Sequence, residues 1–98
     1  MALECNGKSY ELSFGVKRLQ MAEGAVGRSV IKVFEDMPTL SDLATVCGFG
    51  LKEEGAAAWV NPKQGVDLAL GMIGELGFMT VYKEVTEAVE RDCGFLFR

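Results

Sequence analysis

The 98-residue sequence contains no histidine, and this absence removes several kinds of chemistry at once. Serine and cysteine nucleophiles that depend on a histidine base are excluded. A zinc site would lack its usual nitrogen ligand, and the three cysteines, Cys5, Cys47 and Cys93, are far apart with no Cys-x-x-Cys pair. Their odd number and wide spacing predict buried thiols that behave as small apolar side chains. We therefore expect a protein that is not an enzyme, with no catalytic residue, no metal and no cofactor.

Positive charge is also scarce. Ten lysines and arginines face fourteen aspartates and glutamates, which gives a net charge of −4. A nucleic-acid-binding domain needs a basic surface, and so does a domain that is attracted to anionic lipid. Glycine or a carboxylate interrupts every long apolar stretch, so no segment of about 20 residues suits a membrane span. The first residues lack the features of a secretory signal. We expect no nucleic-acid partner, no membrane partner and a cytosolic location.

The clearest local signal is the dipeptide Asn6-Gly7. It tolerates the positive φ angles that a two-residue type I′ turn requires. Apolar and polar residues alternate on both sides of it, and the apolar ones are Leu3, Cys5, Tyr10, Leu12 and Phe14. This period of two predicts strands with one apolar face. We predict a two-stranded β-hairpin over residues 2–14. Because such a ribbon is only marginally stable alone, its apolar face should pack on the remaining chain.

Residues 15–94 are predicted to form a compact bundle of about five helices, so the fold class is mainly α in a single domain, followed by an apolar tail at residues 95–98. The wide apolar surface of the fourth helix suggests that it is central. In the third helix, Val46 and Phe49 fall off the apolar stripe, so this helix is either buried on two sides or leaves an apolar patch. Residues 52–55 read as a solvated turn. Caps and helix breakers set the boundaries: Ser13 or Gly15, Gly27, Ser29, Pro38, Thr39 or Ser41, Asn61-Pro62, Gly77 and Gly94.

Several apolar residues exceed what one small core needs, and these are the candidates for binding a partner. Trp59 either fills the core or forms a hot spot in an interface. The tail either folds back onto the core or contacts another molecule. The full set of candidate partner-binding residues is Phe49, Trp59, Leu68, Met72, Met79, Phe95 and Phe97.

One stretch resembles a known family. The segment Asn6-Gly-Lys-Ser-Tyr-Glu-Leu-Ser-Phe-Gly-Val-Lys-Arg-Leu19 is similar to the opening of tail assembly chaperones from long-tailed bacteriophages. Those chains begin Asn-Gly-Lys-x-Tyr-x-Leu-x-Phe-Gly and continue into a helix with basic and apolar residues. Residues 43–54 resemble the family's helix with an acidic end, residues 78–93 resemble its acidic terminal helix, and Gly94-Phe95 resembles its end. The glycine-rich third helix and the insert at residues 56–60 depart from the family pattern.

The resemblance implies a non-catalytic role. Members of the family bind the tape measure protein, keep it soluble and help to recruit tail tube subunits around it. It also implies action in the host bacterial cytoplasm and absence from the mature virion. Self-association without the partner is a further expectation.

The sequence leaves other classes of function open. An acidic inhibitor of a host enzyme or defence system predicts carboxylates clustered on one face, whereas here they are spread along the chain with lysines among them. A small enzyme subunit predicts a pocket with convergent polar groups, and no such set is evident.

Overall fold

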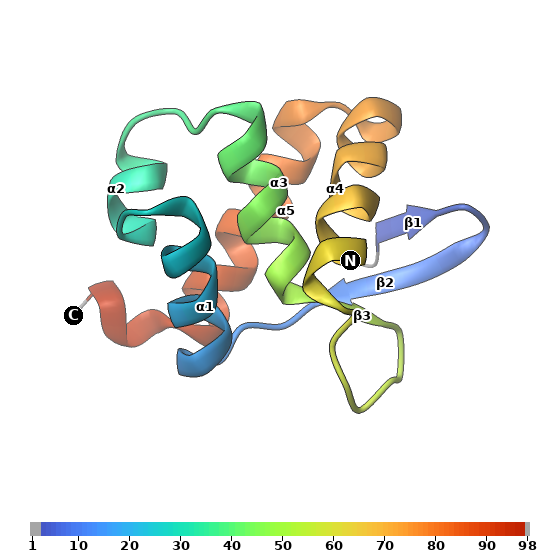
Figure 1. Ribbon diagram of the computed structural model, residues 1–98, viewed down its shortest axis with the longest axis horizontal. Coiled ribbons are helices and arrows are strands. Elements are labelled where there is room, and N and C mark those ends of the chain that lie inside the picture. Colours follow the sequence, from blue (N-terminus) through green and yellow to red (C-terminus); the bar gives the residue numbers. More distant parts are fainter. Residues whose placement is uncertain (1–2, 98) are drawn as a thin grey trace.

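The computed structural model describes residues 3–97, with side chains described for residues 3–96 (Figure 1). Within this range the fold is mainly α, with five helices and a small antiparallel sheet near the N-terminus, which confirms the predicted class. The elements in chain order are β1 (Leu3–Cys5), β2 (Lys8–Leu12), α1 (Val16–Val26), α2 (Val30–Glu35), α3 (Leu40–Gly50), β3 (Leu51–Glu53), α4 (Pro62–Leu76), α5 (Phe78–Asp92) and a 3₁₀ turn, η1 (Gly94–Phe97).

The predicted hairpin is confirmed, but it is part of a three-stranded sheet. Asn6 and Gly7 have φ angles of 54° and 78°, as a turn of this kind requires. A third strand, β3, pairs antiparallel with β2, and Leu12 lies opposite Leu51. The prediction of a turn over residues 52–55 is therefore wrong in its first half. The strand is missed because its backbone partner lies about 40 residues away, and because local polarity suggests a turn.

The central helix is α3, which packs against α1, α4 and α5. The prediction that α4 is central is wrong, because α4 leaves Leu70 and Leu76 exposed. The close approach of α3 and α4 explains why position 48 is a glycine. A Cβ atom on Gly48 would lie 2.5 Å from the backbone nitrogen of Val66. Val46 is buried and Phe49 is half-buried, which resolves the alternatives for this helix in favour of burial on two sides.

Side chains from its neighbours hold α2 in place. The carboxylate of Glu23 accepts a hydrogen bond from the backbone N–H of Val30 at 2.7 Å. The Ser29 hydroxyl accepts one from the N–H of Lys32 at 3.2 Å and so caps the helix. An ion pair between Arg28 and Asp42 ties the preceding loop to α3. The helix has only six residues and is shorter than the sequence predicted. A helix this short depends on such anchors, because its nucleation is unfavourable.

The segment that leaves β2 is held by residues distant in sequence. Arg91 donates a hydrogen bond to the Leu12 carbonyl oxygen at 2.6 Å, and the Phe14 N–H donates to the Asp92 carboxylate at 2.9 Å. The hydrogen bond from Arg91, and then that from Phe14, hold the pKa of Asp92 below its usual value. This junction fixes the sheet and α1 relative to the end of α5.

The three cysteines are free and buried, as predicted. Burial raises the pKa of Cys47 to about 12, so its thiol stays protonated and unreactive near neutral pH. Burial also raises the pKa of Cys93. Within the described residues, no helix has the length and apolar character needed to cross a membrane.

Candidate functional site

Two hollows flank α5, and the first is an apolar groove. It lies between α2 and α5 and encloses about 300 Å³. We call it the α2–α5 groove, and the residues that line it are Val30, Ile31, Phe34, Glu35, Tyr82, Thr86, Val89 and Glu90. Val30 and Val89 are buried, whereas Ile31 has 41% of its surface exposed.

Aromatic packing builds one wall of this groove. The rings of Phe34 and Tyr82 are 5.8 Å apart and tilted by 58°, and Phe78 stacks on Tyr82 at 6.3 Å. Both distances fall in the favourable range for aromatic pairs. The Thr86 hydroxyl donates to the Tyr82 carbonyl oxygen at 2.8 Å, so the helix itself satisfies this donor. The groove therefore presents a mainly apolar surface.

The charges that border the groove are negative. Glu35 and Glu90 line it, and no lysine or arginine of the described residues does. Lys32 lies 3.8 Å from Glu35, but both side chains are largely exposed and the attraction is weak in water. The rim of the α2–α5 groove therefore favours a cation.

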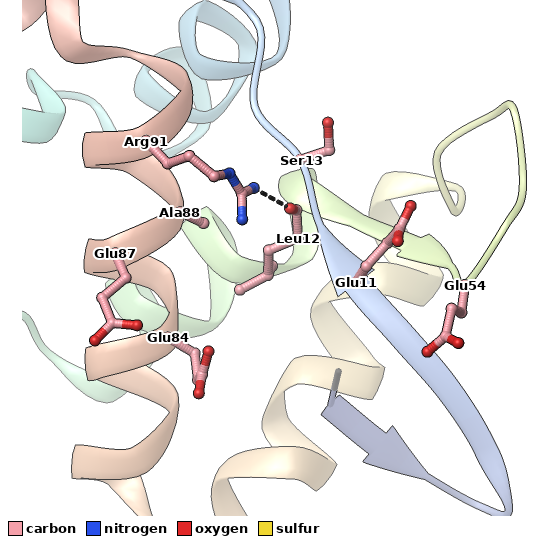
Figure 2. A pocket seen from close by; sticks show the side chains of 8 residues that line it. All are labelled: Glu11, Leu12, Ser13, Glu54, Glu84, Glu87, Ala88 and Arg91. Carbon is pink, nitrogen blue, oxygen red and sulfur yellow. Dashed lines mark hydrogen bonds between the residues drawn. The ribbon is translucent and has the colours of Figure 1, made fainter. Parts of the chain in front are cut away.

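The second hollow lies between β2 and α5 and encloses about 400 Å³ (Figure 2). We call it the acidic hollow. Three separate parts of the chain bring glutamates to it: β2, the turn after β3, and α5. The residues that line it are Glu11, Leu12, Ser13, Glu54, Glu84, Glu87, Ala88 and Arg91.

Arg91, the one cation among the described residues that line the acidic hollow, is already engaged. Figure 2 shows the Arg91 guanidinium directed at the Leu12 carbonyl oxygen. Arg91 also pairs with Asp92 at 2.8 Å, and this hydrogen bond raises the pKa of Arg91. Despite the four glutamates, the described residues contain no group of three or more histidine, cysteine, aspartate or glutamate side chains that could hold a metal. The hollow presents negative charge to the solvent.

The structure separates the candidate partner-binding residues. Met72 is completely buried, so its placement on a binding surface is wrong: it belongs to the core beneath α3. Leu68 is partly buried against the same core. Met79 and Phe95 are exposed at 58% and 43%. The side chain of Phe97 lies outside the described residues, and Leu96 beside it packs on the core.

Phe49 and Trp59 are brought together by Arg18. The guanidinium carbon of Arg18 lies 5.7 Å from the Phe49 ring centre and 5.0 Å from that of Trp59. Trp59 is half-buried and donates from Nε1 to the Ser13 carbonyl oxygen at 2.8 Å. It neither fills the core nor stands free. Instead it anchors the connecting loop, residues 56–60, to the segment after β2.

The α2–α5 groove was missed by the sequence interpretation. Phe34 and Tyr82 lie on apolar helix faces, which a periodic pattern assigns to the core. The available signal was the length of the second helix. Six helical residues cannot cover the face of a fifteen-residue helix, so part of the apolar face of α5 stays open.

Comparison with known proteins adds no relative, since no family model, no curated protein and no solved structure matches the chain.

Proposed function

We propose that this protein is a non-catalytic tail assembly chaperone of a long-tailed bacteriophage. In this role it binds the tape measure protein in the host cytoplasm, helps to recruit tail tube subunits and is left out of the mature virion. The observation that carries the proposal is the opening motif, residues 6–19, which resembles that family and supplies the turn and second strand of the hairpin and the start of α1.

Three properties of the surface support the proposal. The α2–α5 groove has the apolar character that helix-binding grooves use. Met21, Met37 and Met79 are exposed, and methionine adapts its shape to varied apolar partners. The net charge of −4 favours solubility while such surface is uncovered. Together these properties suit a protein that shields an apolar, helical partner.

The test is co-expression with a tape measure protein encoded in the same genome. We expect the tape measure protein to move from the pellet to the soluble fraction and to elute with the chaperone as one complex. An unrelated acidic helical protein of similar size serves as the control for a general effect on expression. If no complex forms and solubility does not rise above this control, the proposal is wrong.

The acidic hollow favours one alternative, an acidic inhibitor that binds a basic surface of a host enzyme. The carboxylates of Glu11, Glu54, Glu84 and Glu87 are spread along the sequence, yet the fold gathers them around one hollow. The double variant Glu84→Lys/Glu87→Lys separates the two functions. An inhibitor would lose its target, whereas a chaperone would still solubilise the tape measure protein through its apolar groove.

A further inference from the structure

The shape of the α2–α5 groove sets the size of its occupant. On α5 the lining residues Tyr82, Thr86, Val89 and Glu90 follow the helical spacing of one face. This row is about 12 Å long at 1.5 Å per residue. A helix laid along it would contact the groove through two to three turns, with anchors at positions such as i, i+3, i+4 and i+7.

The backbone of the groove decides between a helical and an extended occupant. Both walls are α-helices: α5 pairs its backbone internally along most of its fifteen residues, and the Glu23 and Ser29 side chains accept hydrogen bonds from the Val30 and Lys32 N–H groups of α2. An extended peptide would bring unpaired backbone groups to an apolar surface and lose their hydrogen bonds to water. A helical segment satisfies its own backbone and offers only side chains. The groove therefore fits a helix.

The charge of the groove's rim indicates which kind of helix it would bind. Glu35 and Glu90 border the groove, no lysine or arginine is among its described lining, and Lys32 pairs only weakly with Glu35 because both side chains are exposed. A second copy of this chain is acidic overall, with a net charge of −4. A partner with a lysine or arginine beside its apolar face gains an ion pair where a second copy meets repulsion.

We infer that the α2–α5 groove is the docking site for an amphipathic helix of the tape measure protein, with a lysine or arginine placed against Glu90 or Glu35. This inference rests on the proposed function and adds the surface and the chemistry of the bound segment. The short helix α2, held by the Glu23 cap and the Arg28–Asp42 pair, forms the shorter wall of the groove.

Binding of peptides to variants of the groove tests the inference. The probes are fluorescein-labelled 20-residue peptides that cover the tape measure protein in overlapping steps, followed by fluorescence anisotropy. Ile31→Glu places a charge in the apolar groove and should weaken the tightest peptide by about tenfold or more. Leu70→Glu is the matched control, because Leu70 is 42% exposed, much like Ile31, and lies outside the groove. It should change affinity by less than about twofold.

A charge exchange tests the identity of the occupant. Glu90→Lys should bind the same peptide more weakly than the wild type does. The variant should recover affinity for a peptide in which glutamate replaces the basic residue. Circular dichroism confirms that each variant is folded. Equal affinity of Ile31→Glu and the wild type overturns the docking site and leaves the proposed function standing. A wild-type protein that binds no peptide contradicts both. If sedimentation shows that the wild type is a dimer and that Ile31→Glu is a monomer, the groove belongs to a second copy and the inference is overturned.

Discussion

Replacement of Gly48 by alanine is expected to lower the free energy of unfolding by about 2 kcal/mol. The added Cβ would lie 2.5 Å from the Val66 backbone nitrogen and 2.7 Å from the Gly65 carbonyl carbon. These are backbone atoms of α4, so the two helices must separate. The gain in helix propensity, up to about 1 kcal/mol, offsets only part of this cost. Thermal unfolding followed by circular dichroism should show a fall in Tm of roughly 10 °C.

Gly74→Ala is the matched control, because Gly74 lies in α4 and, apart from its chain neighbours and its own helix backbone, no described atom lies within 4 Å of the position that its Cβ would occupy. It should stabilise the protein by roughly 0.5–1 kcal/mol through helix propensity alone. If Gly48→Ala proved as stable as Gly74→Ala, the close packing of α3 on α4 would be contradicted.

Met72→Ala is expected to destabilise the protein by about 2–5 kcal/mol, the usual cost of truncating a large buried side chain. Met72 has no exposed surface and packs in the core. Met79→Ala, at a position 58% exposed, should change stability by less than about 0.5 kcal/mol. Urea denaturation measures both. A Met72→Ala variant that keeps full stability but loses partner binding would restore Met72 to the binding surface and contradict its place in the core.

The local features of the fold could be read from the sequence. Asn6-Gly7 sets the turn without help from distant residues, and Thr39 and Asn61 form caps with their own side chains, at 3.1 Å and 3.0 Å. Strand β3 could not be read, since its backbone partner is β2. The role of α3 was also hidden, because glycines that weaken an isolated helix are what allow two helices to approach closely.

The candidate site was less predictable than the fold. Met72 and Met79 are both helical methionines in apolar stretches, yet the tertiary packing buries Met72 completely and leaves Met79 58% exposed. The α2–α5 groove arises because α2 is too short to cover α5. The acidic hollow joins Glu11 to Glu84 across more than half of the chain. Hollows of this kind depend on tertiary packing, which periodicity in one segment cannot reveal.

Amide hydrogen exchange on the co-expressed complex tests the central claim most directly. In the free protein the amides of α2 should exchange faster than those of α3, because a helix of six residues has few hydrogen bonds of its own and depends on side-chain anchors. In the complex with the tape measure protein we expect exchange at residues 30–35 to slow markedly, while the hairpin turn at residues 6–7 stays unchanged. Protection confined to the acidic hollow, or unchanged exchange throughout α2, would contradict binding in the α2–α5 groove.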